Sequence, residues 1–123
     1  HQNPKNLRAS FAQWLTHEKN PRFAATIANR LWQRSFGLGV QEPLEDLDDL
    51  SKSANPALLQ LLGQIMVKAG FDLREFQRVL FNSRTYQAKS SVIPEIGQSD
   101  QYLFPGPVLR RMTAEQTWDS IHS

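Results

Sequence analysis

Two asparagine–proline pairs constrain the fold of this chain more than any other sequence feature. Asn20-Pro21 and Asn55-Pro56 each stand before a run with apolar residues at helical spacing. An asparagine at the N-cap accepts a hydrogen bond from an otherwise unpaired backbone N–H, and proline suits the first helical position because no donor is needed there. The two pairs therefore predict helices that begin at Pro21 and at Pro56.

Glycines mark the predicted ends of both helices. Gly37 follows the first apolar stripe and Gly70 follows the second. Glycine takes the left-handed conformation that commonly ends a helix, because it has no Cβ to clash. The sequence thus predicts one helix over residues 21–36 and another over 56–69.

Three further helices are indicated by periodicity and by capping boxes. Residues 6–18 carry apolar side chains at positions i, i+4, i+7 and i+8. Asp72 with Glu75, and Thr113 with Gln116, have the spacing of capping boxes, which predict helices directly after Asp72 and Thr113. The side chains on these stripes are expected to form one core: Trp14, Ile27, Leu31, Leu62, Ile65, Phe76 and Leu80.

An all-α fold follows, a compact bundle of about five helices with long loops at about residues 40–54 and 88–112. The length of 123 residues allows one helical domain, spanning residues 1–123. His1 stands where a chain start would have methionine, and the last helix reaches the final residue without a C-cap. We therefore expect a fragment of a longer chain, truncated at both ends.

The composition excludes several kinds of site. The chain has no cysteine, which removes disulfides, thiolate metal sites and Cys-x-x-Cys-His haem attachment. No run of about 18 apolar residues exists, so no membrane span is expected. His1, His17 and His122 are not spaced to converge on a metal ion. The sequence therefore predicts neither a metal nor a cofactor in this segment.

Charge is unevenly distributed along the chain. Residues 1–40 hold six basic side chains against one acidic, and residues 41–50 hold five acidic side chains and no basic one. Two such segments usually neutralise each other or face solvent, and nucleic-acid binding needs about 6–10 clustered phosphate contacts. Nucleic-acid binding through the basic segment is therefore the weakest functional alternative.

The three tryptophans pose a choice between core packing and a sugar-binding platform. Trp14 and Trp118 lie on apolar stripes, so we expect both in the core. Trp32 lies beside its stripe and remains open at this point.

A group of residues that fits no core stripe forms the candidate binding or structural cluster. Arginine pairs with carboxylate or phosphate through two hydrogen bonds and stacks on aromatic rings. Either the arginines tie helix ends to loops, for instance to the acids of residues 46–49, or they face a ligand. The first interpretation is favoured and predicts that Arg30 or Arg84 is mostly buried and makes at least two hydrogen bonds. The candidate residues are Asn29, Arg30, Trp32, Arg84, Tyr86, Arg110 and Arg111.

The order of several motifs over about residues 7–121 resembles one family. It is the C-terminal domain of unknown function in large planctomycete-type multidomain proteins, which are often joined to a cytochrome-c-like domain. The resemblance implies an extracytoplasmic location and, as partners, other domains of the same chain. It supplies no catalytic residues, so these stay unknown. The motifs are Asn20-Pro21-Arg22-Phe23-Ala24, Asn29-Arg30-Leu31-Trp32-Gln33, Phe36-Gly37-Leu38-Gly39-Val40, Asn55-Pro56-Ala57-Leu58-Leu59, Gly70-Phe71-Asp72-Leu73-Arg74, Asn82-Ser83-Arg84-Thr85-Tyr86-Gln87 and Arg110-Arg111-Met112-Thr113-Ala114-Glu115.

The sequence leaves two main alternatives for the function. The first is a scaffold or interaction module within an extracytoplasmic multidomain protein, with a link to electron transfer. The second is part of an enzyme that acts on polysaccharide or another polymer, with its site completed by sequence outside this segment. An exposed apolar patch would favour the module, whereas a cleft of ionisable groups with strongly shifted pKa values would favour the enzyme.

Overall fold

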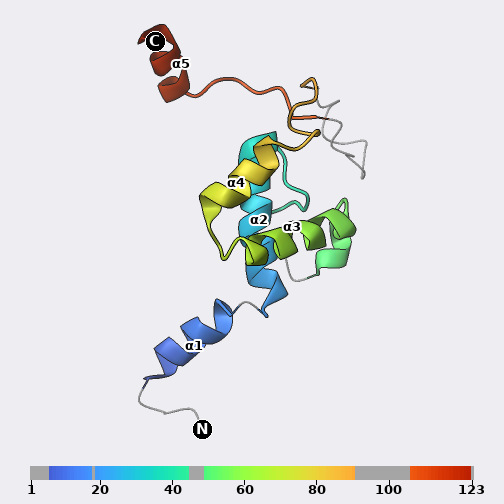
Figure 1. Cartoon of the computed structure of the whole chain (residues 1–123), viewed down its shortest axis with the longest axis vertical. Coiled ribbons are helices and arrows are strands. Elements are labelled where there is room, and N and C mark those ends of the chain that lie inside the picture. The colour runs from blue at the N-terminus through green and yellow to red at the C-terminus, as the bar shows by residue number, and fades with distance from the viewer. Residues whose placement is uncertain (1–5, 18, 45–48, 91–105, 123) are drawn as a thin grey trace.

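The computed structural model describes residues 6–17, 19–44, 49–90 and 106–122. Within these residues the chain is all-α, as predicted, and Figure 1 shows five α-helices joined by irregular segments. A short 3₁₀ helix, η2 (Leu50–Lys52), precedes the third of them. The helices are α1 (Leu7–Leu15), α2 (Pro21–Phe36), α3 (Pro56–Lys68), α4 (Leu73–Phe81) and α5 (Ala114–His122).

The asparagine caps form as the sequence predicts. Asn20 Oδ1 accepts hydrogen bonds from the backbone N–H groups of Arg22 at 3.1 Å and Phe23 at 3.4 Å. Asn55 Oδ1 accepts from the N–H of Leu58 at 3.0 Å. Each cap satisfies donors that the first helical turn leaves unpaired, so α2 and α3 begin where their sequence signals stand.

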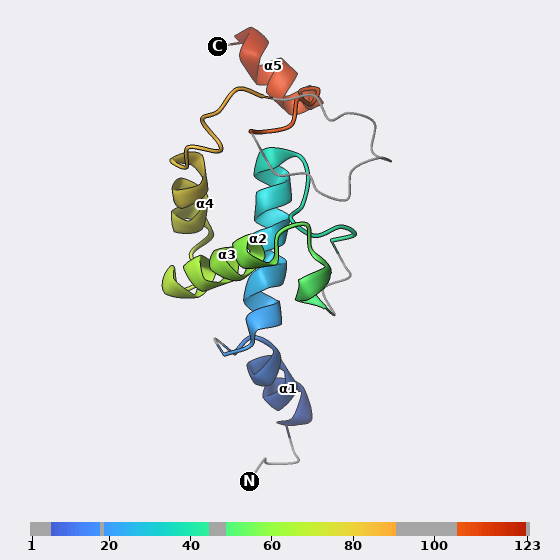
Figure 2. The same cartoon turned by 90° about the vertical axis from the view of Figure 1, so that its right-hand side faces the viewer.

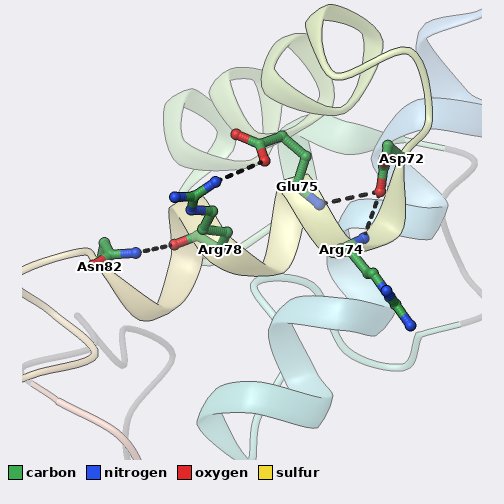
Figure 3. A network of polar contacts seen from close by, with 5 residues as sticks. All are labelled: Asp72, Arg74, Glu75, Arg78 and Asn82. Carbon is green, nitrogen blue, oxygen red and sulfur yellow. Dashed lines mark hydrogen bonds and ion pairs between the residues drawn. The ribbon is translucent and has the colours of Figure 1, made fainter.

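The capping box at the start of α4 is only half formed. Asp72 Oδ1 accepts from the N–H groups of Arg74 at 2.8 Å and Glu75 at 3.1 Å (Figure 3). The N–H of Asp72 donates to the carbonyl of Ala69 at 3.0 Å. The Glu75 carboxylate instead lies 3.8 Å from the Arg78 guanidinium. The cap alone is enough to begin the helix, because it satisfies two N–H groups.

The box before α5 forms in both directions. The Thr113 N–H donates to Gln116 Oε1 at 3.0 Å, and the Gln116 N–H donates to Thr113 Oγ1 at 3.2 Å. Gly37 closes α2 with φ of 90°, and its N–H donates to the Gln33 carbonyl at 2.7 Å. Both signals therefore act as the sequence indicates.

Three helices form the packed body. Helix α3 crosses α2, and α4 contacts both of them, with η2 against α3 (Figures 1 and 2). Helices α2 and α3 pack through small buried residues, Ala24, Ala25 and Ala28 on α2 and Gly63 on α3. The buried apolar side chains are Ala24, Ala25, Ala28, Trp32, Phe36, Val40, Leu59, Leu62, Met66, Phe76 and Leu80.

The predicted core is confirmed for the helices of this body. Leu62, Phe76 and Leu80 are buried, and three further members, Ile27, Leu31 and Ile65, pack against the core while partly exposed. The prediction is wrong for Trp14 and for Trp118, each of which is 64% exposed. A stripe shows which face a helix can bury, but it does not supply a surface to bury it against.

Among the described residues all five predicted helices are present, and α1 and α5 lie outside the packed body of α2, α3 and α4. Neither α1 nor α5 has a buried residue. Figures 1 and 2 place them at opposite ends of the molecule, beyond α2 and α4. In both predicted loops the described residues form no α-helix, and residues 45–48 and 91–105 lie outside the described residues. Among the described helices, none is long and apolar enough to cross a membrane.

Candidate functional site

An open hollow of about 510 Å³ lies at the C-terminal end of α2. We call it the arginine hollow, because three of its six lining residues are arginines and none of the six is acidic. It therefore concentrates positive charge in a concave surface, which favours an anion. The lining residues are Arg30, Gln33, Arg34, Gly37, Leu44 and Arg110.

Helix α2 supplies the first two arginines. Arg30 and Arg34 are four residues apart, so they share one face of the helix, and Gln33 lies next to that face. Arg34 stands in the last turn of α2, where the partial negative charge of the helix end favours a cation. Arg34 is not among the residues predicted for the cluster, although its spacing of four residues from Arg30 indicates a shared helix face.

The third arginine reaches the hollow through a tertiary contact. The N–H of Val108 donates to the carbonyl of Phe36 at 2.8 Å, which holds residues 106–110 against the end of α2. A Cβ on Gly37 would lie 3.1 Å from Val108 Cβ, so the missing side chain of this glycine permits the close approach. Arg110 follows two residues later, and this contact brings it to Arg30 and Arg34.

The described acids of residues 41–50 are engaged in their own turns. Glu42 Oε1 accepts from the N–H of Gly39 at 2.7 Å. Asp49 Oδ1 accepts from the N–H of Ser51 at 3.0 Å and from its hydroxyl at 2.6 Å. The arginines were predicted to pair with the acids of residues 46–49. Residues 46–48 lie outside the described residues, and the carboxylate of Asp49 accepts hydrogen bonds from Ser51.

The prediction that Arg30 or Arg84 is mostly buried is wrong. Both side chains are exposed, and neither guanidinium group makes a hydrogen bond or an ion pair in the described part of the chain. The buried polar residue of this motif is Asn29, with no exposed surface. One helical residue turns the side-chain direction by about 100°, so Asn29 faces the core while Arg30 faces solvent.

Asn29 ties the loop after α2 back onto the helix. Its Oδ1 accepts from the N–H groups of Val40 at 2.8 Å and Gln41 at 3.3 Å, and its Nδ2 donates to the Gln41 carbonyl at 2.9 Å. These bonds satisfy buried backbone groups that water cannot reach. They hold the loop whose residues Gly37 and Leu44 line the arginine hollow.

Two aromatic candidates are structural. Trp32 is 4% exposed and stacks on Phe36 with ring centroids 3.9 Å apart. Tyr86 is partly exposed and meets Phe36 edge to face at 5.6 Å. Tyr86 also lines a second hollow of about 320 Å³ that shares Arg110 with the first. Of the candidate residues, Arg84 and Arg111 are exposed and line neither hollow.

Among the described residues, two carboxyl groups have shifted pKa values, and both are exposed. Hydrogen bonds from the hydroxyl and the N–H of Ser51 lower the pKa of Asp49. The N–H of Glu115 itself and the hydroxyl of Thr113 lower the pKa of Glu115. Hydrogen bonding to the charged form explains both directions, and neither group lines the arginine hollow. In the residues that the structure describes, no cluster of His, Asp and Glu could hold a metal ion.

Helix α1 presents an apolar face that nothing described covers. Leu7 is 67% exposed, Phe11 61% and Trp14 64%, and the rings of Phe11 and Trp14 lie 5.8 Å apart. Leu15 extends this face, which we call the α1 apolar face. Helix α5 is similar, with Trp118 and other apolar side chains in solvent.

Comparison with known proteins finds one family. The family described as "PSD1: Protein of unknown function (DUF1553)" matches residues 7–123. No curated protein and no solved structure shows a significant match to the chain.

Proposed function

We propose an interaction role for this chain, which belongs to the PSD1 (DUF1553) family of proteins of unknown function. In this proposal the chain is a scaffold or interaction module that contacts other domains of the protein to which it belongs. The packed body of α2, α3 and α4 is the rigid part, and the two terminal helices present contact surfaces on either side of it.

The α1 apolar face is the observation that carries the proposal. Three large side chains on it, Leu7, Phe11 and Trp14, each expose more than 60% of their surface. Burying one such side chain is worth about 1.5–3 kcal/mol, so a partner that covered the face would gain several times that amount. Contiguous exposed apolar surface of this kind typically marks a contact with another protein surface.

The proposal also includes a cellular location and a partner domain for this module. We propose an extracytoplasmic location and a cytochrome-c-like domain among the partners, which links the module to electron transfer. The support is the resemblance of motifs such as Asn29-Arg30-Leu31-Trp32-Gln33 to domains found in that setting. Any haem would belong to the partner, because this segment has no cysteine to attach one and we propose that it holds no cofactor of its own.

The chemistry of the arginine hollow favours binding over catalysis. An arginine donates hydrogen bonds but gives up no proton near neutral pH, and an amide such as Gln33 does not titrate. The lining residues therefore offer positive charge without a general base. An enzyme that acts on a polymer remains the alternative if a partner domain supplies the base, and nucleic-acid binding remains the weaker one.

Hydrogen exchange in the longer protein tests the proposal. The backbone amides of α1 should exchange at least about tenfold more slowly in the full-length protein than in the 123-residue chain, because a partner domain covers them. Trp14→Ala should restore fast exchange in the longer protein. Gln13→Ala, on an exposed position of the same helix, should not. Equal exchange of α1 in both forms would overturn the interaction role.

A further inference from the structure

We propose that the arginine hollow is a binding site for a tetrahedral oxyanion, a phosphate or sulfate group, held by Arg30, Arg34 and Arg110. The inference is independent of the apolar faces, because the hollow lies at the C-terminal end of α2 and takes no residue from α1 or α5.

The donor set matches such a group. Each guanidinium carries five N–H donors in a planar fork, which suits bidentate contacts with the oxygens of phosphate, sulfate or carboxylate. The three lining arginines have no partner among the described residues. Gln33 adds an uncharged amide donor at the rim. Within the described part of the chain, three positive charges around one concave surface therefore have no counter-charge, which favours an anion.

A tetrahedral group fits these donors better than a carboxylate does. A carboxylate has two oxygens and one negative charge, whereas a phosphate monoester carries about −1.5 to −2 charges and three acceptor oxygens near neutral pH. Three arginines from two segments line the hollow, so such a group offers one acceptor oxygen for each of them. The volume of about 510 Å³ exceeds that of a bare ion and lies in the range of small-molecule pockets, about 300–1,000 Å³, so the group can carry an organic substituent.

The backbone around the hollow is organised before any ligand arrives. The carbonyls of Gln33 and Phe36 already accept hydrogen bonds from Gly37 and Val108, so the end of α2 offers few competing acceptors to the arginines. The loop that carries Leu44 is tied to α2 by Asn29. A site whose backbone does not have to rearrange loses less free energy when it binds.

Titration of the 123-residue chain with simple anions tests the site. Sodium phosphate, sodium sulfate and sodium acetate are added at one ionic strength, and binding is followed by calorimetry and by amide chemical shifts. We expect saturable one-to-one binding of phosphate and sulfate, with amide shifts concentrated at residues 30–44 and 106–111. Acetate should bind at least about tenfold more weakly, a difference of about 1.4 kcal/mol.

Single charge-removing variants locate the binding. Arg30→Gln, Arg34→Gln and Arg110→Gln should each weaken phosphate binding about tenfold, and because the three side chains are exposed the variants should keep the parent fold. Arg74→Gln is the matched control, since it removes the same charge from an exposed position on α4 (Figure 3). It should leave the affinity unchanged.

Two outcomes would overturn the site. One is an equal loss of affinity for Arg74→Gln and the hollow variants, which would mean that net charge alone governs binding. The other is absence of saturation, or acetate binding as tightly as phosphate.

Phenyl phosphate and phenyl sulfate distinguish the two oxyanions once binding is established. The ester that binds more tightly carries the chemistry of the natural ligand.

Discussion

The carboxamide oxygen of Asn29 accepts a hydrogen bond from the backbone N–H of Val40 at 2.8 Å, across eleven residues of chain. Both residues are buried, with 0% and 1% of their surface exposed. The bond makes the loop after α2 part of the core, because it satisfies a backbone donor that would otherwise be buried without a partner. The position of the arginine hollow depends on this link.

Replacing Asn29 by Ala should destabilise the chain by about 2–4 kcal/mol. The change removes the three hydrogen bonds that Asn29 makes with the backbone of Val40 and Gln41, and each is worth about 0.5–1.5 kcal/mol net. Denaturant unfolding measures the difference. Arg30→Ala, one residue further on the same helix but exposed, is the control and should stay within about 0.5 kcal/mol of the parent. Equal stabilities of the two variants would contradict the assigned role of Asn29.

Two adjacent leucines of α3 should respond very differently to truncation. Leu62 is 2% exposed and Leu61 is 51% exposed. Leu62→Ala should cost about 2–5 kcal/mol, because it removes buried methyl groups and leaves a cavity. Leu61→Ala should cost no more than about 1 kcal/mol. Chemical unfolding of both variants decides the point, and a reversed order would mean that α3 presents the other face to α2.

Two glycine-to-alanine changes should have opposite signs. At Gly39 a Cβ would lie 2.8 Å from the Gln41 carbonyl oxygen and 2.9 Å from Glu42 Oε1, so Gly39→Ala must displace the loop and should cost about 1–3 kcal/mol. At Gly63 the nearest atom, the nitrogen of Ala25, is at an ordinary 3.6 Å. Gly63→Ala should be neutral or stabilise by up to about 1 kcal/mol, because alanine is the better helix former. Melting temperatures of the two variants test both signs.

Tryptophan fluorescence should separate one buried indole from two exposed ones. Trp32 is 4% exposed, whereas Trp14 and Trp118 are each 64% exposed. Acrylamide should quench most of the parent emission, and the protected, blue-shifted remainder should disappear in Trp32→Phe. Trp14→Phe should keep the protected fraction. A protected fraction that vanished with Trp14 instead would place α1 against the body of the chain.

Ser51→Ala should raise the pKa of Asp49 towards its ordinary value of 3.8, because the hydroxyl of Ser51 is the main cause of the lowered pKa. A lowered pKa in the folded chain means that the stabilisation by this carboxylate is present above the unfolded pKa and is lost as pH falls through the folded pKa. The loss should therefore occur below pH 3.8 in the parent. NMR titration of the carboxyl carbon gives the pKa. Thr113→Ala should raise only the pKa of Glu115 and serves as the control.

Local signals in the sequence were sufficient to define the helices. The caps at Asn20, Asn55 and Asp72, and the left-handed Gly37, act within about one turn of the chain, so their meaning does not depend on what packs nearby. For the same reason the all-α class and the order of elements could be predicted. The match over residues 7–123 is likewise a property of the sequence itself.

Burial and the composition of the arginine hollow depend on contacts between distant segments. Trp14 and Trp32 both accompany apolar stripes, yet only Trp32 belongs to the buried core cluster, where it stacks on the ring of Phe36. Periodicity gives the direction of a side chain but not the presence of a partner, which is why Trp14 was wrongly expected in the core.

The sequence by itself determined the helices, their ends and the presence of arginines that belong to no core stripe. Only the tertiary structure decided that Arg110 lies beside Arg30 and Arg34, about 75 residues earlier. The physical reason is a non-local backbone bond, from Val108 to the carbonyl of Phe36, made possible where Gly37 has no side chain. Such a bond joins a backbone N–H and a backbone carbonyl. Every residue except proline carries both groups, so no residue type in the sequence indicates the bond.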